Sequence, residues 1–166
     1  MPKTPRGELK AAIELFIAEF SAFETRFVGM VLRSLSNDAL FVAQTEKLLD
    51  LEARLNLLRR MAFVRNLDQC VIAQLDDVNL RAGRLRHKRD ELSRNLGLIE
   101  MDIGTLHAAR STEATHALAT AGRAPPRYMW LPTIAEIDEC RSGTSKLQAI
   151  LRSIADQLDG HQDLAI

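Results

Sequence analysis

Two long stretches of apolar residues at helical spacing constrain the fold of this 166-residue chain more than any other feature. The first runs from about Glu8 to Arg33, and its apolar residues recur at alternating intervals of four and three: Leu9, Ile13, Phe16, Phe20, Phe23, Phe27 and Met30. This spacing keeps one face of a helix apolar throughout. Ala12, Ile17 and Val31 widen that face, which favours a helix of a globular bundle over a two-stranded coiled coil. We interpret the phenylalanines as core or dimer contacts, because glutamates flank them and a base-stacking platform needs exposed rings among basic residues.

The second stretch extends from about Val64 to Leu96. Its apolar positions follow the same spacing and are Leu67, Val71, Leu75, Val78, Ala82, Leu85, Leu92 and Leu96. Arg89 occupies one position of this series where an apolar residue is expected. A guanidinium on an apolar face costs free energy unless it finds an acceptor or opens onto a cleft. Gly97 is predicted to end this helix.

Capping residues predict three further helices. Asn37 or Asp38 is expected to cap a short helix that ends near Gln44, and Asp50 to cap the next one. Thr133 and Glu136 have the spacing of a capping box. They predict a closing helix to about Gly160, with a kink over 141–144 and a frayed tail over 161–166.

The helical pattern fades between residues 101 and 130, where glycines and prolines interrupt it. This segment is predicted to be a long irregular connection, and such connections are either functional or mobile. Strand-like alternation is absent, and β-branched residues are sparse. The sequence therefore predicts one all-α domain over residues 1–166, an antiparallel bundle of about four to five helices.

Charge and composition exclude several classes of protein. The chain has 22 basic and 22 acidic side chains, so its formal net charge is zero. This argues against a protein that coats nucleic acid non-specifically, although a local basic patch is compatible with it. The most apolar stretch, Ala11–Leu32, contains four charged residues and is not expected to span a membrane. No secretory signal is recognisable, so we expect a cytoplasmic protein.

The cysteines and histidines do not have the spacing of a metal site, and we expect neither a metal nor a cofactor. Cys70 and Cys140 allow a single disulfide. Without an export signal, we expect buried or inert thiols in a reducing compartment instead.

The charged end of the second long helix is the most informative segment for function. Between Arg81 and Arg94 there are six Lys or Arg residues and two acids. Arg86, Asp90 and Arg94 lie four residues apart, on one face. One interpretation is a solvated basic face with Arg89 extended toward water. The other is a cleft in which Arg86, Arg89 and Arg94 bind phosphate or a partner's carboxylate, while Asp90 holds the guanidinium groups in place.

The stretch from Leu85 to Asn95 resembles the motif helix of HEPN domains, which are small bacterial helical bundles. Their pattern is an Arg, a polar residue, three variable residues and a His. Here Arg89 takes the Arg position, Asp90 takes the polar position, and Arg94 stands where the His is expected. The resemblance extends as a pattern to the helix after Asp50 and to the closing helix. It implies a homodimer whose motif helices meet, metal-independent RNA cleavage in active members, and a defence or toxin–antitoxin setting.

The arginine at position 94 departs from that motif. An arginine stays protonated and is not an ordinary general base. His87 lies two turns before Arg94, so we interpret it as a surface histidine rather than a replacement. The leading hypothesis is a catalytically degenerate HEPN-like binding or regulatory protein, with RNA or an acidic protein as partner. Two alternatives stay open: a weak or non-standard ribonuclease that uses Arg89 with His87 or Arg94, and a purely structural helical adaptor.

Overall fold

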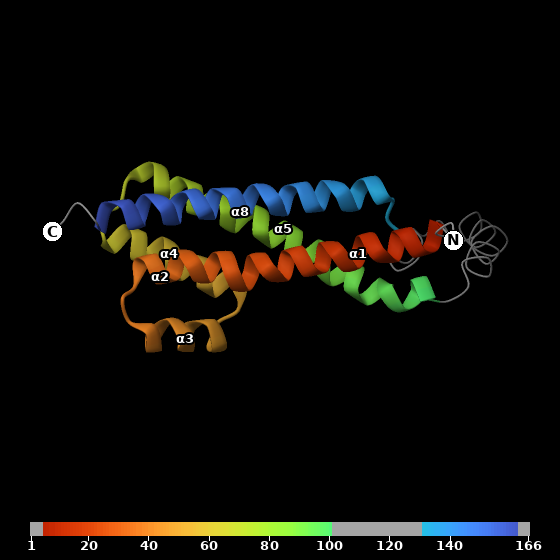
Figure 1. Ribbon diagram of the computed structural model, residues 1–166, viewed down its shortest axis with the longest axis horizontal. Helices are drawn as coiled ribbons and strands as arrows, with labels where there is room; N and C mark the ends of the chain where they lie inside the picture. Colours follow the sequence, from red (N-terminus) through yellow and green to blue (C-terminus); the bar gives the residue numbers. More distant parts are fainter. Residues whose placement is uncertain (1–4, 101–130, 163–166) are drawn as a thin grey trace, which may run out of the picture.

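The computed structural model describes residues 5–100 and 131–162, and all the regular structure in these ranges is helical (Figure 1). The elements in chain order are α1 (Pro5–Ala22), η1 (Phe23–Phe27), α2 (Val28–Leu35), α3 (Ala39–Leu48), α4 (Leu51–Val64), α5 (Gln69–Glu100) and α8 (Ile134–Gln162). The first three join into one long helix. The all-α bundle predicted from the sequence is therefore confirmed.

The long helices lie side by side along one axis (Figure 1). Helix α5 packs against α1, α4 and α8 and runs antiparallel to all three. Helix α8 packs against α1 and α2 and runs in the same direction as they do. The short helix α3 contacts α2 and stands at the edge of the bundle.

The first helix contains one π-helical turn, η1, which the sequence analysis missed. Before and within this turn the buried residues are Ile13, Phe16, Phe20, Phe23 and Phe27, as predicted. After it they are Val28, Val31, Leu32 and Leu35, whereas Met30 of the predicted series is only half-buried. A π turn adds one residue to the helical repeat, which shifts the buried series by one position. The interpretation of the phenylalanines as core residues is confirmed.

Two of the predicted caps have the expected geometry. The side chain of Asp38 accepts hydrogen bonds from the backbone N–H groups of Leu40 and Phe41, at 2.9 and 3.0 Å. Asp50 accepts one from the N–H of Ala53 at 2.9 Å. Helix α3 extends to Leu48, one turn beyond the predicted end.

The predicted start of the second long helix at Val64 is wrong, because Val64 ends α4. Asn66 adopts a positive φ of 54° there. The N–H of Leu67 bonds to the carbonyl of Ala62, and that of Asn66 bonds to Phe63, each at 3.0 Å. These two bonds are those of a Schellman ending, in which asparagine is the usual alternative to glycine. Helix α5 starts only at Gln69.

The predicted stop at Gly97 is also wrong, since α5 continues to Glu100. An interior glycine weakens a helix but does not remove a backbone donor, so it need not end it. Helix α8 begins with the predicted capping box. Thr133 N–H donates to the carboxylate of Glu136, and the N–H of Glu136 donates to the hydroxyl of Thr133 at 3.2 Å. It continues as one helix through residues 141–144, where a kink was expected, and on to Gln162.

The predicted connection over residues 101–130 and the last four residues of the predicted tail lie outside the described residues. Within the ranges the structure covers, no helix combines the length and apolar character that a membrane crossing requires. Cys70 and Cys140 are both free. Burial raises the pKa of the Cys140 thiol. The thiols were expected to be buried or inert, and the first alternative is wrong for Cys70, which is exposed because the inward position of this turn belongs to Val71.

Candidate functional site

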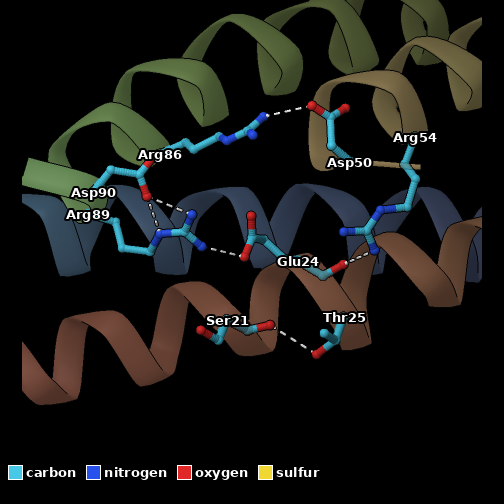
Figure 2. Close-up of polar contacts among 8 residues, drawn as sticks. All are labelled: Ser21, Glu24, Thr25, Asp50, Arg54, Arg86, Arg89 and Asp90. Carbon is cyan, nitrogen blue, oxygen red and sulfur yellow. Dashed lines mark hydrogen bonds and ion pairs between the residues drawn. The ribbon is translucent and has the colours of Figure 1, made fainter. Parts of the chain in front are cut away.

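Arg89 turns toward the first helix, where it meets acceptors from its own chain (Figure 2). Its Nη1 lies 2.6 Å from Oε2 of Glu24, on the π turn. Its Nε and Nη2 donate to Oδ1 of Asp90, at 2.9 and 2.7 Å. The guanidinium carbon also lies 5.3 Å from the ring centroid of Phe20, within the range of a cation–π interaction. Arg89 is therefore held on all three nitrogens.

This ion pair lies at the joint between α5 and the first helix. The side chains of Arg89 and Glu24 are 21% and 15% exposed. At this degree of burial the pair is screened less than a surface salt bridge, and removing one partner would leave a poorly solvated charge. Asp90 is about half exposed and forms the outer side of the pair. We call Glu24, Arg89 and Asp90 the Arg89 cluster.

Arg86 points away from the Arg89 cluster and toward the start of α4 (Figure 2). Its Nη1 lies 3.3 Å from Oδ2 of Asp50, the residue that caps α4. The pKa of Asp50 is lowered, mainly by the hydrogen bond from the Ala53 N–H and further by Arg86. Arg86 thus joins α5 to α4, whereas Arg89 joins α5 to the first helix.

Arg94 and His87 are not part of either arrangement. Arg94 is exposed, and its Nε donates to the backbone carbonyl of Asp90 at 3.1 Å. His87 is exposed and has no hydrogen bond or ion pair with another described residue. The predicted pairing of Asp90 with both Arg86 and Arg94 through its carboxylate is not formed, since that carboxylate bonds Arg89 instead. The sequence therefore identified the polar residues at this end of the helix but not the residues to which each of them bonds.

Two residues that the sequence analysis missed complete the arrangement. Arg54 of α4 is 9% exposed, and its Nη1 donates to the backbone carbonyl of Glu24 at 2.8 Å (Figure 2). Its Nε has no partner among the described residues. Arg54 lies in the buried series of α4 with Leu51, Leu55 and Leu58, so it carries the same signal that drew attention to Arg89. Glu24 does not interrupt an apolar series in the sequence. The direction of its side chain depends on the π turn, which the sequence did not reveal.

The π turn also has a side-chain hydrogen bond at its start. The hydroxyl of Thr25 donates to the carbonyl of Ser21 at 2.9 Å (Figure 2). Bonds of this kind compete with the regular backbone pattern of a helix. Two backbone carbonyls at the π turn, those of Ser21 and Glu24, therefore accept hydrogen bonds from the side chains of Thr25 and Arg54.

A hollow of about 400 Å³ lies between α4 and α5 beside Arg86. Its apolar lining comes from Leu51, Leu55, Leu80 and Gly83, and its polar lining from Glu52, Asp76, Asn79 and Arg86. Three of these polar residues are bonded within the chain: Asp76 to Arg59, Asn79 to Asn56, and Arg86 to Asp50. The hollow therefore has an apolar surface, and most of the polar side chains at its edge already bond to other residues of the chain.

The carboxylates of the Arg89 cluster, those of Glu24 and Asp90, both accept hydrogen bonds from Arg89. Arg86, Arg89 and Arg94 do not exchange protons at neutral pH, and Asp90 accepts two bonds from Arg89. Nowhere in the described ranges do three or more His, Cys, Asp or Glu side chains gather as a metal site would require. What the arrangement does is join three helices through charge-assisted hydrogen bonds.

Comparison with known proteins finds no protein-family model that matches the chain, no similar curated protein and no similar solved structure.

Proposed function

We propose that this protein is a helical binding or regulatory module without catalytic activity, in which the Arg89 cluster holds the bundle together. The observation that carries the proposal is the state of Arg89, whose Nε, Nη1 and Nη2 all donate to Glu24 or Asp90. Three of the five N–H groups of Arg89 are thus already used, and a phosphate would have to share the guanidinium with two carboxylates of the same chain. Breaking such a part-buried ion pair leaves a carboxylate without its partner, which is costly.

The positions of Arg94 and His87 also favour a binding module over a ribonuclease. A general base must reach the proton it removes, directly or through one water. Arg94 has no basic form at neutral pH, and the exposed His87 is not bonded to the cluster. A catalytic pair with Arg89 is therefore not formed by either residue.

The likeness to HEPN domains remains part of this proposal, and its specific residues all lie in α5 between Leu85 and Asn95. It brings with it a cytoplasmic homodimer in which two α5 helices meet, with RNA or an acidic protein as partner, in a defence or toxin–antitoxin setting. Multi-angle light scattering across a range of concentrations tests the dimer. A monomer at all concentrations removes this part of the proposal.

An RNA cleavage assay in the presence of a chelator tests the absence of catalysis. The wild type is compared with Arg89→Ala and with His87→Ala. The second variant changes an exposed side chain, so it is expected to fold even if the first does not. We expect the same background cleavage for all three proteins. Cleavage by the wild type that either substitution abolishes would establish a ribonuclease and overturn the proposal.

A purely structural adaptor is the second candidate, and a specific observation favours it. Leu40, Leu48 and Phe63 are more than half exposed, although large apolar side chains are normally turned inward. Such side chains serve contacts with other molecules rather than the stability of the isolated bundle.

A further inference from the structure

Exposed apolar side chains gather on α3, on α4 and at Leu49 between them. Of the nine large apolar residues that are exposed in the described part of the chain, six lie here: Leu40, Phe41, Leu48, Leu49, Phe63 and Val64. Helix α3 turns Val42 and Thr45 inward, which leaves Leu40 at 68% and Leu48 at 74% exposure. The inward side of α3 is thus no more apolar than its outward side, so packing in the bundle does not explain the leucines.

Helix α4 adds a second series of residues, which meets Leu49 at a hollow. Ala53, Leu57, Arg60 and Val64 are spaced four, three and four residues apart, which places them on one helix face. A hollow of about 340 Å³ lies at the start of this face, where Leu49, Ala53, Asn56, Leu57 and Arg60 line it. The name α3–α4 face is used here for three exposed residues of α3, the residues that line this hollow, and Val64: Leu40, Lys47, Leu48, Leu49, Ala53, Asn56, Leu57, Arg60 and Val64.

The charged residues of the α3–α4 face are both basic. Lys47 and Arg60 form no ion pair with another described residue. The acidic residues of the two helices and of their caps do not line this hollow. Asp38 and Asp50 cap helices, Glu46 pairs with Arg33, and Glu52 lines the separate hollow between α4 and α5. The face therefore combines an apolar hollow with positive charge, although the whole chain is neutral.

From this juxtaposition we infer that the α3–α4 face binds an acidic amphipathic helix of a partner protein. The apolar side chains of that helix enter the hollow beside Leu49 and Leu57, and its carboxylates pair with Lys47 and Arg60. Helices that bind in grooves present apolar anchors at three- and four-residue intervals, and flanking charges select the partner. The inference rests on the proposed function, because it names the surface and the partner of the binding module.

Charge and shape favour this occupant over the others. A second copy bound symmetrically would bring two sets of the same cations to one interface with no acid to match them. RNA would gain little from a leucine-rich surface, since phosphates bind to cations and hydrogen-bond donors. An anionic membrane would need more than two cations and a convex apolar side, whereas this face is hollowed.

Selection from a displayed library of random peptides of about 16 residues on the full-length protein tests the inference. We expect enriched peptides to carry apolar residues at helical spacing together with Asp and Glu. Binding of a synthesised peptide is then measured by fluorescence anisotropy. The double substitution Lys47→Glu/Arg60→Glu should weaken it by about tenfold or more. A peptide in which lysines replace the acids should regain affinity for that variant.

The matched control is Arg84→Glu/Lys146→Glu, which reverses two exposed basic residues on α5 and α8. It should leave peptide affinity unchanged. Leu48→Ser should weaken binding without lowering the melting temperature, because Leu48 is largely exposed.

Four outcomes overturn the inference: no enriched peptide, enriched peptides without acidic residues, equal losses in the test and control variants, or binding to anionic vesicles that Leu48→Ser abolishes. None of these bears on the absence of catalysis. Conversely, RNA cleavage that depends on Arg89 overturns the proposed function and leaves the peptide result as it stands, so the two failures are distinguishable.

Discussion

Glu24 satisfies two buried or half-buried arginines at once. Its carboxylate accepts from Arg89 of α5, and its backbone carbonyl accepts from Arg54 of α4. Both arginines occupy positions in otherwise apolar helix faces, where a guanidinium without acceptors would be costly. The π turn makes this double contact possible by presenting the side chain and the carbonyl of one residue to different neighbours.

A double-mutant cycle measures the coupling between Glu24 and Arg89. We expect Arg89→Met to lower the free energy of unfolding by about 2 kcal/mol, because Glu24 is left half-buried without a cation. Glu24→Gln should cost less in the Arg89→Met background than in the wild type. Urea unfolding followed by circular dichroism gives each value. Arg94→Met, on the exposed side of the same helix, is the control and should change stability by less than about 0.5 kcal/mol.

Acid should weaken the start of α4 through Asp50. The pKa of Asp50 is lower in the folded protein, so its charged form stabilises the fold above the unfolded pKa. That contribution is lost on acidification, as pH falls from the unfolded pKa through the lower folded pKa. Asp50→Asn keeps a capping oxygen but does not titrate. Urea unfolding at several pH values should therefore show a shallower acid dependence for Asp50→Asn than for the wild type, and equal slopes would contradict the prediction.

For single residues, the sequence singled out Arg89 and its polar neighbours, but it did not predict the residues to which they bond. The interruption of an apolar series singled out Arg89 but left open whether it extends toward water or turns inward, and in the structure it turns toward Glu24. Its partner Glu24 lies 65 residues away on a turn with no recognised sequence signal, so the pairing was beyond reach. The expected sharing of Asp90 between Arg86 and Arg94 assumed that neighbours on one helix face bond each other, whereas residues of other helices compete for the same groups.

Among the elements, the helices with capping residues were predicted well, and the errors lie at ends without recognised caps. Asp38, Asp50 and Thr133 cap the helices expected from them. The end of α4 was missed because Asn66, rather than glycine, adopts the left-handed conformation of its Schellman ending. The end predicted at Gly97 was wrong because a long helix tolerates an interior glycine.

Two interior glycines should respond differently to alanine. A Cβ atom on Gly83 of α5 would meet open space, so Gly83→Ala should raise the free energy of unfolding by about 0.8 kcal/mol. A Cβ on Gly29 of α2 would collide with the carboxylate of Glu46, which pairs with Arg33 and ties α3 to α2. We expect Gly29→Ala to fall short of the gain at Gly83 and to speed hydrogen exchange over residues 39–48. Equal gains with unchanged exchange would contradict the role given to Glu46.

In the whole molecule, the first helix is the element that the others share. Contacts with α5 and α8 are made by α1, and contacts with α3, α4 and α8 are made by α2. Ion pairs reinforce two of them: Arg89 with Glu24, and Arg141 of α8 with Glu19. Glu19 raises the pKa of Arg141, consistent with a persistent pair. The bundle was predictable from apolar spacing, but the parallel course of α1 and α8 was not, because spacing carries no information on direction.

Of the two proposed partners, RNA or an acidic protein, the balance of charge over the molecule favours the acidic protein. Acids and bases are equal in number, and many arginines already have carboxylate partners within the chain, among them Arg59, Arg86, Arg89 and Arg141. We expect no binding of a labelled single-stranded RNA at about 50 mM salt, measured by fluorescence anisotropy. Micromolar affinity that falls steeply with added salt would instead indicate a basic surface for nucleic acid.

The π turn lets the first helix hold one residue more than a regular α-helix would need. Because the extra residue is taken up between 23 and 27, the buried residues before and after the turn stay on the same face of the helix. Removing one residue between 23 and 27 would convert the turn into an ordinary helical turn and keep Ile13, Phe16 and Phe20 in the core, whereas a deletion within α1 would rotate the residues before it by about 100°. Deletions are normally tolerated in loops, but here one position inside a long helix can lose a residue without exposing the core.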